Sequence, residues 1–179
     1  MIRLTLLAGL VLAATVHIVA VFLVPRLAPQ DAYQRFAGLG PDFRFNLLGK
    51  ATPASSPLPG LDPAMRFAIC RYDLSARPLE IRVGLEADYW ALSLHDRRGQ
   101  SFYVVNNRSA DRGRLEVLLA TPRQATDIRR LLPENQLGRL VVEAPDSEGF
   151  AVVRALVGLP SEAESIEGKL RQATCAPRS

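Results

Sequence analysis

A histidine and an aspartate stand side by side at His95 and Asp96, within the stretch DYWALSLHDRRGQSFYVVNNR. His95 is the one histidine outside the N-terminal apolar segment, so a Ser-His-Asp or Cys-His centre would have to use it. Asp96 cannot orient that ring, because adjacent side chains of an extended strand point to opposite faces. No G-x-S-x-G sequence accompanies the pair. We therefore interpret the two residues as the end of a strand and the start of a turn.

A second interpretation makes the same stretch a small polar pocket at the rim of a sheet. Its lining side chains would be Tyr89, His95, Asn106 and Arg108, and it would suit an anionic or sugar-like ligand. In the simpler interpretation Asn106, Asn107 and Arg108 only end the return strand, where asparagine tolerates unusual backbone angles. The residue types are compatible with both interpretations.

Other catalytic designs find little support in the sequence. Zinc sites need spacings such as CxxC or HxxxH, and phosphate or dinucleotide sites need a glycine-rich loop, and none of these occurs. A carboxylate mechanism could draw on Asp73, Asp96, Glu116 or Glu143, but it needs two carboxyl groups within roughly 5–10 Å. We therefore expect no metal and no cofactor, and lean against an enzyme.

Residues 4–24 read LTLLAGLVLAATVHIVAVFLV and carry no formal charge. As a helix this segment spans about 31 Å, which matches a hydrocarbon core of roughly 30 Å. A cleaved signal peptide is the rival interpretation, but the apolar run is longer than usual and lacks a good cleavage site. We predict an uncleaved anchor over residues 1–26, with the lipid bilayer as the partner of residues 4–24.

Charges near this segment bear on its orientation. Arg3 on one side opposes Arg26 and Arg35 on the other, so the positive-inside rule is nearly balanced. The short N-terminus favours a globular domain outside the cytoplasm, hence a single-pass protein of the inner (cytoplasmic) membrane with a periplasmic domain. His17 lies inside the span and is a candidate for contact with a protein partner in the envelope.

The chain has two cysteines, Cys70 and Cys175, an even number in a chain with an export-like segment. If they form a disulfide, it closes a loop of about 105 residues. Two buried free thiols are the alternative.

The net charge of +4 does not indicate nucleic-acid binding. Setting aside Arg3 and Arg26, which flank the apolar segment, reduces it to +2, and the remaining charges alternate in sign. A surface that neutralises phosphates needs clustered like charge. We therefore expect no nucleic-acid partner.

Residues 27–63 contain six prolines and predict a Pro-rich linker, with a short amphipathic helix around 31–37. The globular domain is predicted over 64–179. Strands with two-residue periodicity are expected at 64–72, 78–85, 90–96, 102–106, 114–120, 139–144 and 150–157. Capping boxes at Thr121 and Ser161 predict helices to about 132 and 174. The fold class is mainly β, a β-sandwich or curled antiparallel sheet with two peripheral helices, preceded by one N-terminal transmembrane helix.

The stretch 88–108 resembles bacterial proteins that carry the domain of unknown function numbered twelve fifty-four, related to the one numbered twelve fourteen. Members show an aromatic pair before a serine or threonine, then Tyr-Asp where this chain has His95-Asp96. Residues 149–160 resemble the family's closing strand, and 68–81 its short membrane-anchored branch. The resemblance covers 64–175 and implies an exported or tethered β-rich domain without an established activity. Because His95 stands where the family has tyrosine, the resemblance does not carry a role of that tyrosine over to this chain.

The sequence is compatible with two functions. The first is a membrane-tethered, non-enzymatic binding or interaction module on the periplasmic side of the cell envelope. The alternative is a small-ligand-binding or hydrolase-like domain that uses the rim of Tyr89, His95, Asn106 and Arg108. A concave pocket that contains all four side chains would favour the alternative.

Overall fold

A computed structural model describes residues 2–27, 32–49, 61–111, 113–131 and 140–178. The chain divides into two units, Met1–Asp31 and Ala32–Ser179. The first unit is the helix α1 (Ile2–Leu27). Within it Ile2–Val24 is long and apolar enough to cross a membrane, and its side chains are exposed rather than packed in a core.

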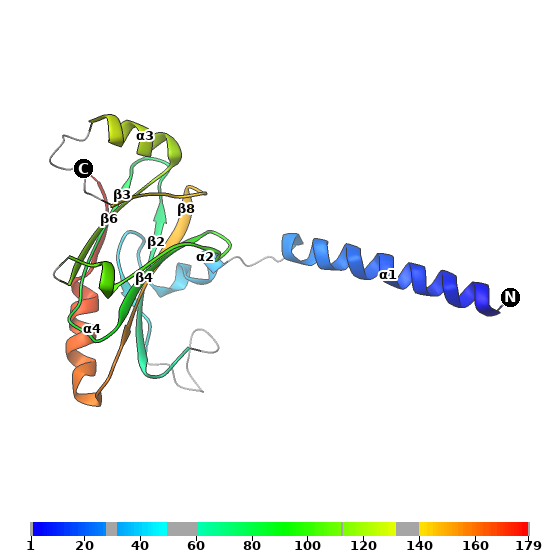
Figure 1. The fold of residues 1–179 in the computed structure, drawn as a ribbon, viewed down its shortest axis with the longest axis horizontal. Helices are drawn as coiled ribbons and strands as arrows, with labels where there is room; N and C mark the ends of the chain where they lie inside the picture. The colour runs from blue at the N-terminus through cyan, green and yellow to red at the C-terminus, as the bar shows by residue number, and fades with distance from the viewer. Residues whose placement is uncertain (1, 28–31, 50–60, 112, 132–139, 179) are drawn as a thin grey trace. The chain divides into compact units, whose positions relative to one another are not determined.

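The second unit is a sandwich of two β-sheets (Figure 1). The five-stranded sheet has the order β1 (Asn46–Leu47), β2 (Met65–Asp73), β8 (Glu148–Leu156), β4 (Trp90–Asp96) and β5 (Ser101–Asn106). The four-stranded sheet has the order β7 (Leu140–Glu143), β6 (Arg114–Ala120), β3 (Leu79–Gly84) and β9 (Thr174–Pro177). The predicted mainly-β class is confirmed. Neighbouring strands are antiparallel except β6 and β7, which are parallel.

The hydrophobic core lies between the two sheets and follows the predicted alternation. Leu79, Ile81 and Val83 on β3 are buried, and so are Trp90, Leu92 and Leu94 on β4. A disulfide joins Cys70 on β2 to Cys175 on β9, so the predicted pairing links one sheet to the other. Both cysteines are buried, which keeps the bond away from solvent.

Two longer helices accompany the sheets. α3 (Pro122–Leu131) begins at a reciprocal cap: the Thr121 N–H donates to Gln124 Oε1 at 3.0 Å, and the Gln124 N–H donates to Thr121 Oγ1 at 3.4 Å. α4 (Ala163–Gln172) follows a 3-10 turn, η4 (Pro160–Glu162). The predicted cap at Ser161 is wrong. The cap lies two residues earlier, at Leu159, whose N–H donates to Glu162 Oε2.

Residues 32–48 form a covering segment on the outer face of the five-stranded sheet. It contains α2 (Ala32–Arg35), the 3-10 turn η1 (Ala37–Leu39) and β1. Phe36 and Leu48 pack against Ile69 of β2 and Phe150 of β8. Packing therefore begins well ahead of residue 64, because large apolar side chains are interspersed among the prolines of the predicted linker. Residues 50–60 of that linker lie outside the described residues.

Candidate functional site

The tip of the β4–β5 hairpin is a tight turn over Asp96–Gly99. The Gly99 N–H donates to the Asp96 carbonyl at 3.1 Å, and the Gln100 N–H donates to Asp96 Oδ1 at 2.8 Å. Gly99 has φ 94°, a left-handed conformation that glycine adopts without strain. The Asp96 carboxylate is buried and stabilises the turn. The interpretation of this aspartate as a turn residue is confirmed.

His95 points to the face opposite Asp96 and is held by three contacts. Its Nδ1 lies 3.1 Å from the Gly99 carbonyl oxygen, and its Nε2 lies 2.9 Å from Ser93 Oγ. Since a carbonyl oxygen only accepts hydrogen bonds, Nδ1 carries the hydrogen. The ring stacks on Phe150 with 4.9 Å between centroids and 5° between planes. Both nitrogens are therefore engaged in fixing the hairpin to the sheet.

The structure separates the four residues of the predicted rim. Tyr89 precedes the first residue of β4, whereas His95 lies six positions further on, which is roughly 20 Å along an extended strand. Asn106 pairs with Ala91 at the end of β4 that is remote from His95, and its Oδ1 accepts the N–H of exposed Arg108 at 3.1 Å. The prediction of one pocket lined by all four side chains is wrong.

An arginine that sequence reasoning missed lies beside Tyr89. Ala91 pairs with Asn106 on one side and with Arg154 of β8 on the other, so the three residues form a row across the outer face. The Arg154 Nη2 donates to Tyr89 Oη at 3.2 Å, and its guanidinium lies 5.9 Å from the centre of that ring. Its Nε is buried without a partner among the described residues. A charged residue in the middle of the apolar run FAVVRALV was the available signal.

A second polar cluster lies where the covering segment meets the sheet. Arg71 of β2 donates to both carboxylate oxygens of Asp42, at 2.7 and 2.9 Å. Its guanidinium also lies 4.5 Å from the centre of the Tyr33 ring, and Arg97 approaches the same ring at 5.8 Å. The hydrogen bond with Asp42 raises the pKa of Arg71, and burial raises the pKa of Tyr33. Arg97 in turn pairs with Glu148.

Comparison with known proteins identifies the family. A sequence model described as "Protein of unknown function (DUF1254)" matches residues 49–177. The chain belongs to the DUF1254 family. This confirms the resemblance that the hairpin motifs indicated, while the relation to the domain numbered twelve fourteen and the membrane-anchored branch stay predictions. The covering segment precedes the matched range.

Two solved structures resemble the DUF1254 domain. The VPA0106 protein from Vibrio parahaemolyticus is 16% identical with a TM-score of 0.59, over 82% of this chain and 34% of that one. An uncharacterised protein from Burkholderia cenocepacia is 19% identical with a TM-score of 0.46, over 74% of this chain and 34% of that one. The first likeness shows a shared fold. The chain thus spans about a third of each protein's length. No curated protein matches it.

The carboxylates considered for catalysis each have a structural partner in the DUF1254 domain. Asp96 caps the hairpin turn, Asp73 accepts from Ser75, Glu116 pairs with Arg82, and Glu143 pairs with Arg129. Glu116 and Glu143 lie in the four-stranded sheet, and the other two lie in the five-stranded sheet. Across the described residues, no group of three His, Cys, Asp or Glu side chains could hold a metal ion.

A shallow polar depression of about 470 Å³ lies between α4, η4 and the β3–β4 loop. Glu86, Asp88, Glu162 and Lys169 contribute its charged lining. The Lys169 ammonium donates to Glu86, and this hydrogen bond lowers the pKa of the Glu86 carboxyl. Glu162 has a structural role, because its carboxylate caps η4. Among the described residues, the Asp88 carboxylate has no hydrogen bond or ion pair that would give it such a role. Ser165 also lines the depression, and among the described residues no hydrogen bond joins its hydroxyl to a base.

Proposed function

We propose that this chain is a membrane-tethered DUF1254 domain on the periplasmic side of the inner membrane, and that it binds another envelope component rather than catalysing a reaction. The observation that carries the proposal is the buried disulfide between Cys70 and Cys175. Disulfides persist in oxidising compartments such as the periplasm and are rare in the cytosol. A buried bond that joins two sheets fits a domain that folds after export.

The apolar helix supplies the tether in this proposal. Ile2–Val24 has the length and composition of a membrane span, and a cleaved signal sequence has the same features. We favour an anchor because the apolar stretch exceeds the usual 7–15 residues of a signal peptide. The bilayer would be contacted through residues 4–24, and His17 would be available for a hydrogen bond to a neighbouring membrane helix.

The arrangement of the hairpin supports binding over catalysis. Both ring nitrogens of His95 form hydrogen bonds, one with the Gly99 carbonyl oxygen and one with Ser93 Oγ. A role as general base would therefore require breaking contacts that hold the hairpin. Tyr89, at the opposite end of β4, could not act on the same substrate atom.

Reporter fusions test where the domain lies. Alkaline phosphatase needs its own disulfides, so a fusion after Ser179 should be active in cells if the domain is periplasmic, while a matched fluorescent-protein fusion stays dark. Intact mass spectrometry of the membrane fraction should give about 19.6 kDa, the mass of the full chain. A bright fluorescent fusion with inactive phosphatase would contradict the location, and a shorter soluble chain would contradict the tether.

Cross-linking in intact cells tests the binding role. The wild-type chain should give a discrete, reproducible cross-linked product of defined mass. His17→Leu keeps the apolar span but removes the imidazole, and it should weaken that product if the partner is met within the membrane. Absence of any discrete product at several cross-linker lengths would count against a binding module.

A further inference from the structure

We propose that the face of the domain carrying Arg35 and Arg98 contacts the headgroups of anionic phospholipids. The inference rests on the proposed function in one respect, namely that α1 stays in the bilayer. It adds a second attachment of the chain to the membrane, made by the globular domain itself.

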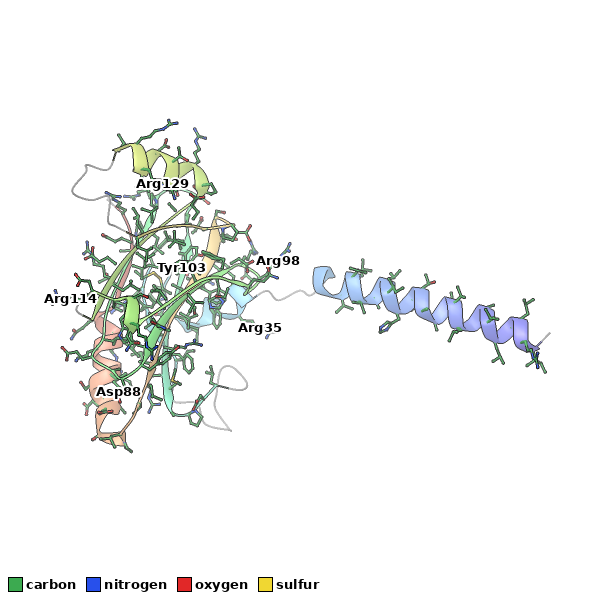
Figure 2. All side chains as sticks on the ribbon, viewed as in Figure 1. Arg35, Asp88, Arg98, Tyr103, Arg114 and Arg129 are labelled. Atoms are coloured by element: carbon green, nitrogen blue, oxygen red, sulfur yellow. A yellow bond between two sulfur atoms is a disulfide. The ribbon has the colours of Figure 1, made fainter. Side chains whose placement is uncertain are left out.

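Two exposed arginines meet at this face from distant parts of the sequence. Arg35 ends α2, and Arg98 lies in the turn at the tip of the β4–β5 hairpin. The two elements are adjacent because the Tyr33 N–H donates to the Arg97 carbonyl at 3.2 Å. Figure 2 shows Arg35 and Arg98 on the same side of the domain.

The neighbouring charges leave these two guanidinium groups uncommitted. Asp42 is held by Arg71, and Glu148 pairs with Arg97. Among the described residues, neither Arg35 nor Arg98 has an ion pair, and both are exposed. Asp73 also acts electrostatically on the neighbouring Tyr33, and its carboxylate accepts hydrogen bonds from Ser75. The guanidinium fork matches the oxygens of a phosphate, so a phospholipid headgroup is the complementary partner.

The short connection between α1 and α2 limits how far α2 can lie from a bilayer that holds α1. Only residues 28–31 separate Leu27 at the end of α1 from Ala32 at the start of α2. Even fully extended, that connection reaches roughly 18 Å. A bilayer that holds α1 therefore lies within a few side-chain lengths of α2, and anionic lipid attracts basic groups placed so close to its surface.

Several contacts join the covering segment to the five-stranded sheet. Arg71 binds Asp42 through two hydrogen bonds and lies over Tyr33, while Phe36 packs edge-on against Phe150 at 4.8 Å. A force or contact at α2 is thereby transmitted to β2 and β8. Contact between Arg35 and lipid would therefore orient the whole sandwich rather than a loose arm.

Paramagnetic relaxation in lipid bicelles tests this proposal on the full chain. The ¹⁵N-labelled protein is placed in bicelles of phosphatidylcholine, or of phosphatidylcholine with one quarter phosphatidylglycerol, each with a trace of gadolinium-chelating headgroup. With the anionic lipid, amides at 34–36 and 97–99 should relax at least twofold faster than those at 126–130 in α3. Arg35→Gln with Arg98→Gln should at least halve the enhancement at 97–99, whereas amides 34–36 should keep part of theirs because the short connection holds α2 near the bilayer.

A matched control removes two exposed arginines elsewhere. Arg123→Gln with Arg130→Gln changes the net charge equally but lies on α3, so the enhancement at 34–36 and 97–99 should persist. Equal relaxation of all domain amides, or an enhancement unchanged by phosphatidylglycerol and by the first pair of substitutions, would overturn the lipid contact while leaving the anchor intact. If the amides of 4–24 behave as solvent-exposed, the anchor itself fails, and the proposed function fails with it.

Discussion

The two faces of the five-stranded sheet are built on different principles. The inner face presents Trp90, Leu92 and Leu94, all fully buried, and is joined to the opposite sheet by the disulfide. The outer face carries His95, Arg71 and Arg154 among apolar residues such as Ile69 and Phe150, and the covering segment hides only part of it. At its β5 edge Val104 remains 54% exposed. The inner face stabilises the fold, whereas the polar side chains of the outer face fix the hairpin and the covering segment, and its β5 edge remains open to solvent.

The energies involved differ accordingly. Fully burying a large apolar side chain contributes about 1.5–3 kcal/mol, and the inner face collects many such residues. A partly exposed ion pair contributes about 0–1 kcal/mol. Because the covering segment depends on a few polar and aromatic contacts, it should open locally at a lower free energy than the core.

The largest effect should come from removing the disulfide. Cys70→Ala with Cys175→Ala should lower the free energy of unfolding by about 4–5 kcal/mol, because a bond across some 105 residues strongly restricts the unfolded chain. For a domain of this size that corresponds to a drop in Tm of roughly 10 °C or more. Thermal unfolding followed by circular dichroism measures it. If reduction of the wild type leaves its Tm unchanged, the inner face does not depend on this bond.

The next effect concerns the close approach of three strands at Gly149. An alanine side chain there would overlap the His95 carbonyl and the Tyr72 hydroxyl, both of which lie against this glycine. Gly149→Ala should cost about 1–3 kcal/mol in urea unfolding, as overpacked cores do. Gly168→Ala in α4 meets no atom within 4 Å and should be neutral or slightly stabilising. Equal effects of the two substitutions would contradict this packing.

A pH titration isolates one inner-face group. Burial raises the pKa of Tyr72 well above its ordinary value of 10.0, and Asp96 and Asp146 raise it further. Below pH 10 this tyrosine is protonated in both states, so it adds no pH dependence. Above pH 10 the unfolded chain loses the proton first, and stability should fall by up to about 1.4 kcal/mol per pH unit.

Tyr72→Phe should reduce that alkaline slope, and Tyr33, whose pKa burial also raises, accounts for part of what remains. At pH 7 it should cost about 1 kcal/mol, because the hydroxyl donates to the His95 carbonyl at 3.0 Å. Urea unfolding between pH 8 and pH 11 compares the two proteins. Parallel slopes would show that another group titrates in this range.

The smallest global effect should come from the outer face. Asp42→Asn weakens the two hydrogen bonds with Arg71, and should cost up to about 1 kcal/mol of global stability. Its local effect should be larger, seen as faster hydrogen exchange across residues 33–48. Glu143→Gln breaks the more exposed pair with Arg129 and is the matched control. Unchanged exchange at 33–48 would mean that apolar packing alone holds the segment.

Local sequence signals predicted the sheet strands well. The alternation at 79–83 specified which side chains of β3 are buried, and the reciprocal cap of Thr121 with Gln124 marked the start of α3. The turn that begins at Asp96 was also predicted from the sequence, and it closes at Gly99. Such features depend on a few neighbouring residues, and so they can be inferred without knowing the rest of the fold.

Features that depend on distant contacts were missed. β9 has four residues and no periodicity, and it forms because Cys175 and its neighbours pair with β3. Prolines suggested a spacer where residues 32–48 pack on the sheet. The rim prediction failed for another reason. His95 and Asn106 lie at opposite ends of one hairpin, and this separation follows from the pairing register of β4 with β5, which residue types alone do not reveal.

Alkylation of membranes prepared without reductant tests the account most directly, since a domain outside the cytoplasm should hold Cys70 and Cys175 as a disulfide. After denaturation in excess alkylating reagent, the full chain should show no added label by intact mass, and proteolysis should release a linked peptide pair. When the disulfide is reduced before alkylation, the chain should gain two labels, one on each cysteine. Two labels without reduction, on protein that was folded in the membrane, would contradict both the oxidising location and the link between the two sheets.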